Sequence, residues 1–353
     1  MSYLRKNIEA MAGYTPGEQP GEGRGIVKLN TNENPYPPSP RVLDVLRRTD
    51  WSVLRKYPDP MADKVRDIVG RLWGVGRDEV LCGNGSDELL TLVVRAFVGE
   101  GERIAWPTPT YSLYPVLADI QGAVAVEVPT GEGFSLPLDD LAAVDSRVLI
   151  ICNPNAPTGV FTPPEAIARL AEAFPGVVVV DEAYADFGPG SAIPAMRGSG
   201  NVLVLRTLSK SYSLAGLRFG YAVGPADLLA GMVKCKDSYN VDAVAIEAAA
   251  AALGDQDWMR ANARKVRAER SRLTGRLARL GFDVTPSESN FLLARVPGGD
   301  AAACYEDLKT RGILVRYWNL PRLADKVRIT VGTPEENDAL LAALQKPSEE
   351  TSP

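Results

Sequence analysis

The stretch Val177-Val-Val-Val-Asp-Glu-Ala-Tyr184 decides the fold class of this chain. A continuous apolar run of this kind predicts a β-strand buried on both faces, as in parallel sheets covered by helices. Asp181 would lie at the carboxyl end of that strand, which is the edge where open α/β sheets bind ligands. The alternative is that Asp181 only caps the turn that follows.

Short apolar runs like this one alternate with amphipathic stretches between about residues 80 and 223, which is typical of β-α-β units. The predicted strands are Val80–Cys82, Arg103–Ala105, Val124–Val128, Val148–Cys152, Val177–Asp181, Val202–Thr207 and Phe219–Val223. The predicted helices are Glu88–Val98, Ser112–Ile120 and Pro164–Phe174, the last with Thr162 as its N-terminal cap. We therefore expect an α/β fold in which a mostly parallel seven-stranded sheet lies between helices.

The regions on either side of this block have a different character. Residues 258–280 are rich in Arg and Ala with helical spacing, and the short strands 291–296, 313–316 and 327–331 follow them. The first residues are rich in Gly and Pro, which favours an extended arm. We expect three parts: an arm with part of a small domain (1–45), a large domain (46–245) and a smaller α+β domain (246–353).

The amino-acid composition excludes several kinds of catalytic and binding site. The 353 residues include no histidine, which excludes Ser-His and Cys-His nucleophiles and His-ligated metals. The four cysteines are too far apart for a zinc or dithiol motif, so we expect buried free thiols and no metal site. The net charge of -5 has no basic stripe for nucleic acid, and no apolar run could span a membrane. Without a secretory signal, we expect a cytoplasmic protein whose partners are small molecules or a second copy.

Lys210 follows another predicted strand, in Leu205-Arg-Thr-Leu-Ser-Lys210. A lysine in a desolvated pocket loses its proton readily and can attack a carbonyl group. Thr207, Ser209 and Arg218 nearby supply hydroxyl and guanidinium groups suited to a phosphate. The alternative is an ordinary surface lysine followed by a turn.

Three further loops follow predicted strands: 83–88, 106–111 and 152–160. In the first, Gly83-Asn-Gly-Ser-Asp-Glu88 opens a helix, and backbone amides at a helix start bind anions. The motif lacks the Walker lysine and the third glycine of a dinucleotide site, and each loop alone could be a turn. Five polar or aromatic clusters at strand ends nevertheless favour one shared site.

In order and spacing these motifs resemble the pyridoxal 5′-phosphate (PLP) dependent aminotransferases of the aspartate aminotransferase fold, fold type I, and among them the histidinol-phosphate aminotransferases. The resemblance runs from about Leu29 to Leu344. Its pieces are Leu29-Asn-Thr-Asn-Glu-Asn-Pro35, Lys56-Tyr-Pro-Asp-Pro60, Gly83–Glu88, Asn153-Pro-Asn-Ala-Pro-Thr-Gly159, Asp181–Tyr184, Ser209-Lys210 with Arg218, and Val327-Arg-Ile-Thr-Val-Gly332.

The resemblance implies a role for each site residue. Lys210 would form the Schiff base with PLP, Asp181 would bind the pyridine nitrogen, and Tyr184 would bind the phenolic oxygen. Tyr111 would stack on the ring. The phosphate would be held by the loop of Gly85, Ser86 and Asp87, by Thr207, Ser209 and Arg218, and by Tyr57 from a second subunit, which makes a homodimer necessary.

One position departs from the family pattern. The residue before Pro-Thr-Gly is usually an Asn that binds the phenolic oxygen, and here it is Ala156. We expect Tyr184 to act alone or with Asn153 or Asn155, of which Asn155 is the candidate substitute, although it could equally be a turn residue.

The implied reaction needs no histidine, because the displaced Lys210 would itself move the proton between substrate and cofactor. The family pattern predicts transfer from histidinol phosphate to 2-oxoglutarate, with ping-pong kinetics and glutamate as product. Arg328 and Arg316 would bind substrate anions and Tyr14 would close over them; a surface ion pair is the alternative for Arg316. The alternative hypotheses are an aromatic amino acid aminotransferase and a PLP decarboxylase of a phosphorylated amino acid. A PLP-sensing regulator is disfavoured, because we expect no room in this sequence for the DNA-binding module of such regulators.

Overall fold

The computed structural model describes residues 2–20 and 25–345. Its centre is a seven-stranded sheet in the order β2-β8-β7-β6-β5-β3-β4, in which β8 runs antiparallel to both neighbours and the other adjacent pairs are parallel. The strands are β2 Val80–Gly83, β3 Arg103–Thr108, β4 Val124–Pro129, β5 Val148–Cys152, β6 Val177–Asp181, β7 Val202–Thr207 and β8 Gly220–Val223. The predicted mostly parallel seven-stranded sheet is confirmed.

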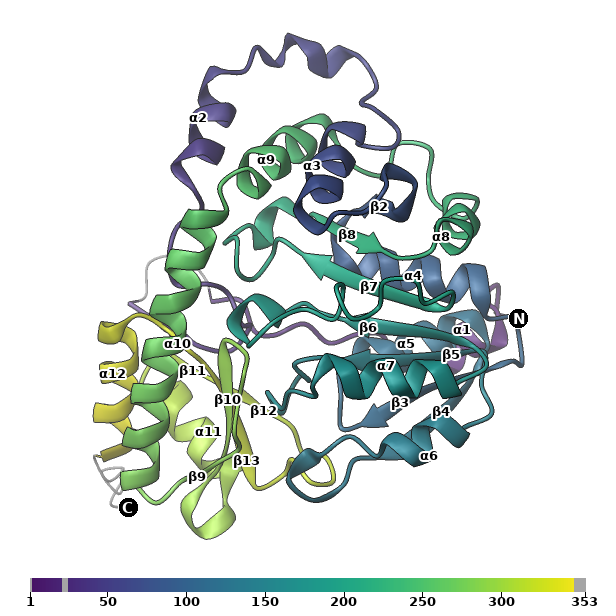
Figure 1. The fold of residues 1–353 in the computed structure, drawn as a ribbon. Helices are drawn as coiled ribbons and strands as arrows, with labels where there is room; N and C mark the ends of the chain where they lie inside the picture. Colours follow the sequence, from purple (N-terminus) through teal and green to yellow (C-terminus); the bar gives the residue numbers. More distant parts are fainter. Residues whose placement is uncertain (1, 21–24, 346–353) are drawn as a thin grey trace.

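The run that suggested this fold is the middle strand, β6. Val178, Val179 and Val180 are fully buried, because helices cover the sheet on both sides: α6 and α7 lie in front of it in Figure 1, and α4 and α5 lie behind. The helices of this part are α2 Pro40–Arg48, α3 Asp63–Trp73, α4 Gly85–Phe97, α5 Leu113–Gln121, α6 Leu138–Ala143, α7 Pro164–Ala173, α8 Ala226–Val233 and α9 Ala243–Leu253.

The expected cap of α7 is wrong. The helix begins at Pro164 after Pro163, and no side chain caps it. Thr162 instead uses its backbone to hold Asn153, whose side-chain amide bonds both the Thr162 nitrogen (2.8 Å) and the Thr162 oxygen (2.9 Å). The missing N–H of a proline at the helix start removes one of the donors that a cap would satisfy.

A second core lies at the lower left of Figure 1, around an antiparallel sheet in the order β12-β13-β10-β9. Its elements are β9 Asp283–Val284, β10 Phe291–Arg295, β12 Arg316–Tyr317, β13 Lys326–Thr330, α10 Gln256–Arg279, α11 Ala301–Thr310 and α12 Pro334–Gln345. Helix α9 and the first half of α10 pack on the large core, whereas Leu273 and Leu277 of α10 pack on the small one. We therefore propose a domain boundary within α10, later than residue 245.

The predicted strand 313–316 is two short strands. β11 (Ile313–Leu314) pairs in parallel with β1 (Val27–Lys28), and β12 pairs with β13, so the chain changes partner at Val315. This pairing joins residues 27–28 of the N-terminal arm to residues 313–314. The arm also contains a short helix, α1 Lys6–Ala10, beside the end of α5, where the Asn7 amide donates to the Asp119 carbonyl at 2.7 Å.

Within the described ranges, no helix combines the length and apolar character needed to cross a membrane. All four cysteines are free thiols; Cys82 and Cys152 are buried as expected, and Cys235 and Cys304 are only partly so.

Candidate active site

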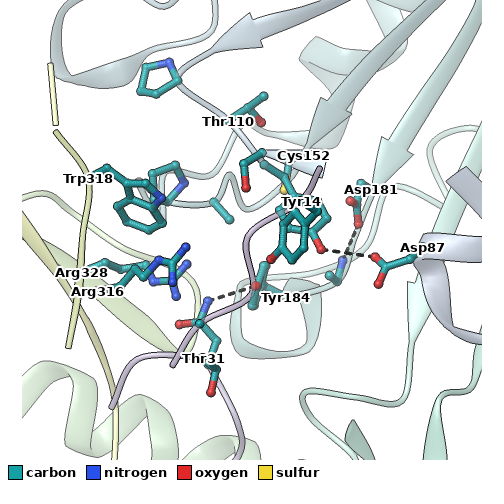
Figure 2. Close-up of a pocket in the computed structure, with 18 of the residues that line it drawn as sticks. Tyr14, Thr31, Asp87, Thr110, Cys152, Asp181, Tyr184, Arg316, Trp318 and Arg328 are labelled. Carbon is teal, nitrogen blue, oxygen red and sulfur yellow. Dashed lines mark hydrogen bonds between the residues drawn. The ribbon is translucent and has the colours of Figure 1, made fainter. Parts of the chain in front are cut away.

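A cavity of about 290 Å³ opens where the carboxyl ends of the large sheet face the small domain. Strand ends bring most of its polar lining together, because parallel strands finish at one edge. Of the predicted site residues, the cavity is lined by Tyr14, Ser86, Asp87, Tyr111, Asp181, Tyr184, Thr207, Ser209, Lys210, Arg218, Arg316 and Arg328. Figure 2 shows Arg316, Arg328 and Trp318 on one side, Asp87 and Asp181 on the other, and Tyr14 and Tyr184 between them.

Lys210 lies just past the end of β7, with its amine inside the cavity. Its Nζ donates to the Thr31 carbonyl at 3.2 Å, and it has no ion-pair partner among the described residues. Burial, assisted by the positive charge of Arg328, lowers the pKa of Lys210 to about 8. About a tenth of this amine is therefore uncharged at pH 7, far more than at the ordinary pKa of 10.5, and the uncharged form is the one that attacks a carbonyl group.

Asp181 at the end of β6 is buried, with only 2% of its surface exposed. It accepts hydrogen bonds from the Tyr114 hydroxyl at 2.8 Å and the Ala183 amide at 3.2 Å, but no described cation pairs with it. Burial raises the pKa of Asp181 to about 6, although both hydrogen bonds oppose the rise. A buried carboxylate without a cation is costly, so the site is prepared for a positively charged or proton-donating ligand atom.

The start of α4 and the loop after β7 together form a cup, which is lined by Ser86, Thr207, Ser209 and Arg218. Arg218 reaches across it, with Nη1 3.3 Å from Ser209 Oγ and Nη2 3.1 Å from Asp87 Oδ2. Gly85 has φ +79°, and a Cβ at that position would lie 2.8 Å from Arg218 Nη2. A side chain here would be strained by the positive φ and would push the guanidinium away from the helix start, where free amides attract anions.

Two arginines line the opposite, small-domain side. Arg328 is held by the Asn30 carbonyl at 2.6 Å, while its buried Nε has no hydrogen-bond partner. Burial lowers the pKa of Arg328 to about 10, and the nearby charge of Arg316 adds to this effect. Arg316 forms no ion pair with any residue that the structure describes, so the alternative of a surface ion pair is not supported there. Its donors bind the Thr15 and Pro16 carbonyls of the arm at 3.2 and 3.3 Å.

Aromatic rings complete the walls. Tyr14 from the arm meets Tyr111 edge-on, with ring centroids 6.1 Å apart. Tyr184 packs edge-on against Phe291 at 5.0 Å. Tyr57 is not brought into this cavity: it is 80% exposed and stacks on Tyr239 with ring centroids 4.4 Å apart.

The structure does not support Asn155 as the substitute for the missing amide. Its Nδ2 donates to the Pro109 carbonyl (3.0 Å) and to Thr158 Oγ1 (2.9 Å), and its Oδ1 accepts from Thr110. These bonds hold two turns together and leave the Asn155 amide no N–H to donate to a ligand. Asn153 is likewise occupied by Thr162, so neither amide reaches the cavity that Ala156 lines.

Several lining residues were not singled out from the sequence. Tyr114 and Cys152 lie next to Asp181, and Asn30, Thr31 and Asn32 border the small-domain side. Tyr114 carried a weak signal, since it is three positions after Tyr111 on the start of α5. Residues 30–32 belong to the motif Leu29–Pro35. Their role depends on the residues that they contact in the folded chain, which the sequence does not reveal.

The sequence matches the aminotransferase class I and II family over residues 24–344, and the chain belongs to that family. Among curated relatives, a histidinol-phosphate aminotransferase 1 of Trichormus variabilis is 47% identical, covering 98% of both chains. The histidinol-phosphate aminotransferase of Rhodopirellula baltica is 44% identical, covering 97% of this chain and 95% of that one.

Solved structures agree with these sequence matches. The histidinol-phosphate aminotransferase of Sinorhizobium meliloti, solved in complex with pyridoxal-5′-phosphate, has a TM-score of 0.89 at 28% identity and covers 98% of this chain and 97% of that one. A Thermus thermophilus aspartate aminotransferase mutant has a TM-score of 0.82 at 24% identity, covers 98% of both chains and shows the shared fold alone.

Proposed function

We propose that this enzyme transfers the amino group of histidinol phosphate to 2-oxoglutarate, with PLP as cofactor and Lys210 as its attachment point. The observation that carries the proposal is the pair Lys210 and Asp181. They lie at neighbouring strand ends in one cavity, Asp181 buried and Lys210 partly buried, and neither has an ionic partner among the described residues. The pKa of Asp181 is raised and the pKa of Lys210 is lowered, so the neutral form of each side chain is favoured.

The residues present fit this cofactor. Asp181 would bind the pyridine nitrogen and keep it protonated, which removes the cost of the unpaired carboxylate. The cup of Ser86, Thr207, Ser209 and Arg218 would hold the phosphate, with Gly85 leaving space for the guanidinium. When bound, PLP supplies an electron sink for negative charge developing at the substrate Cα.

Lys210 would carry the proton in the reaction. With its amine free, Lys210 Nζ would take the proton from the substrate Cα and release it to the carbon on the other side of the substrate nitrogen. A pKa near 8 suits an amine that must both accept and release a proton around neutral pH. The chain has no histidine that could do this instead.

Arg328 and Arg316 support a substrate that carries an anion distant from its amine. A guanidinium binds either a phosphate or a carboxylate in a bidentate manner. Histidinol phosphate has a phosphate and no α-carboxylate, whereas glutamate has two carboxylates, and the same two arginines could serve both. The unpaired Arg328 Nε is a donor left for such an anion.

A homodimer would complete the site. Tyr57 and Tyr239 form a stacked and exposed pair, and Val53 and Leu54 nearby on the chain are each at least half exposed. Apolar and aromatic groups exposed in this way favour burial against another protein surface. A second copy would cover them and bring its Tyr57 to the phosphate cup. The four free thiols agree with a reducing cytoplasm.

An amino-donor screen tests the proposal. The enzyme with PLP and 2-oxoglutarate is given histidinol phosphate, phenylalanine or aspartate, and glutamate formation is measured. Histidinol phosphate should be the best donor, and Lys210→Ala should lose the visible absorbance of bound cofactor together with at least about a thousandfold of activity.

Other outcomes separate the rival functions. Brisk turnover of phenylalanine with negligible turnover of histidinol phosphate would make this an aromatic aminotransferase. Release of carbon dioxide from threonine phosphate without an amino acceptor would make it a decarboxylase. Unchanged absorbance and activity in Lys210→Ala would remove the central residue of the proposal.

A further inference from the structure

Three consecutive residues of the arm contact three residues of the site. The Asn30 carbonyl binds Arg328 (2.6 Å), the Thr31 carbonyl accepts from Lys210 (3.2 Å), and the Asn32 amide donates to Tyr184 Oη (3.0 Å). The first two are backbone contacts that many side chains would allow. The third depends on the identity of the side chain, so Asn32 is the informative position.

Asn32 is held firmly from the small-domain side. Thr330 Oγ1 accepts from the Asn32 backbone nitrogen (3.0 Å) and donates to Asn32 Oδ1 (3.1 Å), and the Asn290 amide donates to the Asn32 carbonyl (2.9 Å). The residue is 1% exposed and has φ +57°, a left-handed conformation that asparagine tolerates better than most residues. These contacts leave the Asn32 Nδ2 directed at the tyrosine.

The polarity of this hydrogen bond determines what Tyr184 can do. A phenol oxygen can accept from one group while its single hydrogen is donated to another. Since Asn32 donates to it, the Tyr184 hydrogen is available to an acceptor in the cavity. No other hydrogen bond to Tyr184 Oη occurs in the part of the chain that the structure describes.

No neighbouring side chain duplicates this arrangement. Ala156 has no donor, and the amides of Asn153 and Asn155 are engaged in turns. We propose that Asn32 is a positioning residue that fixes the Tyr184 hydroxyl as a donor to the cofactor's ring oxygen, and so links the small domain to the electronic state of the cofactor. This inference rests on the proposed use of PLP but not on the identity of the amino donor.

The consequence can be measured on the cofactor itself. A donor at the ring oxygen stabilises negative charge there, which lowers the pH at which the lysine–cofactor linkage loses its proton. Loss of the donor should raise that pH, which is read from the visible absorbance of the holoenzyme. We expect Tyr184→Phe and Asn32→Ala each to raise the midpoint, the latter by about one pH unit.

The double variant distinguishes positioning from general disturbance. If Asn32 acts through the tyrosine hydroxyl, Asn32→Ala should add no further shift in a Tyr184→Phe background. An equal shift in both backgrounds, or none in the wild-type background, would overturn the proposal. The titration uses no substrate, so failure of the histidinol-phosphate assignment would leave this result unaffected.

Thr330→Val provides a second, milder variant if Asn32→Ala does not fold. It keeps the side-chain shape, lies outside the cavity lining and removes only the hydroxyl that holds Asn32. It should raise the midpoint by less than Asn32→Ala does, and it too should have no effect once Tyr184 is Phe. A midpoint unchanged by Thr330→Val with Tyr184 in place would count against the proposed link.

Discussion

Asp181 and Glu182, two neighbouring carboxylates at the end of β6, have opposite surroundings. Asp181 points into the active-site cavity and is buried without a cation. Glu182 points away from it and binds Arg206 at 2.9 Å, the Ser191 hydroxyl at 2.6 Å and the Ala192 amide at 2.5 Å. Burial raises the pKa of both carboxyls, but only for Glu182 does a buried arginine oppose the rise.

This difference in ion pairing indicates that Glu182 stabilises the fold, whereas Asp181 is available to bind a ligand. Arg206 also binds Asp186, which accepts from the Ser211 hydroxyl next to Lys210, so the Glu182 network joins the two strand ends that carry the site. The network is satisfied by the protein alone. Asp181 and Lys210 form hydrogen bonds but have no ion-pair partner among the described residues, which lowers stability but keeps their charges available to a ligand.

Breaking the satisfied network should have the largest effect. Arg206→Met leaves the buried Glu182 and the partly buried Asp186 without their cation, which should lower the free energy of unfolding by about 3–5 kcal/mol. Chemical denaturation measures it. Lys64→Met, at the exposed pair with Glu247, is the matched control and should cost less than about 1 kcal/mol. Equal losses in the two variants would show that the buried network is not special.

Removing the negative charge of Asp181 should instead raise the free energy of unfolding. A pKa near 6 against the ordinary 3.8 means that ionised Asp181 costs the folded, cofactor-free chain about 3 kcal/mol at neutral pH. The wild type should lose this stability as pH rises from about 4 to 6, and Asp181→Asn should not. At pH 7 the variant should therefore be the more stable of the two, by up to that amount, while losing transaminase activity.

Unfolding of both cofactor-free proteins between pH 4 and pH 8 tests this expectation. Asp257→Asn, at a fully exposed position, is the control and should change stability by less than about 0.5 kcal/mol. An Asp181→Asn chain that is less stable than the wild type at pH 7 would mean that the carboxylate contributes to the fold.

The smallest expected effect concerns the unpaired lysine. In the cofactor-free chain Lys210 should be half ionised near pH 8, and Arg328→Gln should raise that midpoint by less than about one unit, because a like charge is removed. The pH dependence of Lys210 acetylation, followed by mass spectrometry, reports it. Lys309, whose pKa is raised by its hydrogen bond to Glu18, serves as the internal reference and should not respond.

Sequence patterns were sufficient for the large sheet and for the residues at its carboxyl edge. A valine run followed by Asp181 and a strand followed by Lys210 are local signals, and parallel pairing then forces both ends to one edge. The exchange of partner at Val315 was not predictable, because it depends on which strands lie beside residues 313–317. The prediction that Thr162 caps α7 was wrong for a similar reason, because the Thr162 backbone is hydrogen-bonded to the side chain of Asn153.

The sequence by itself determined the α/β class, the aminotransferase motifs and the absence of any histidine for proton transfer. These are properties of residue order and composition. Only the tertiary structure decided that Asn155 serves a turn, that Asn32 reaches Tyr184, and that Asp181 is unpaired while Glu182 is paired. The physical reason is that hydrogen-bond partners and burial come from segments up to 301 residues apart, which local sequence cannot specify.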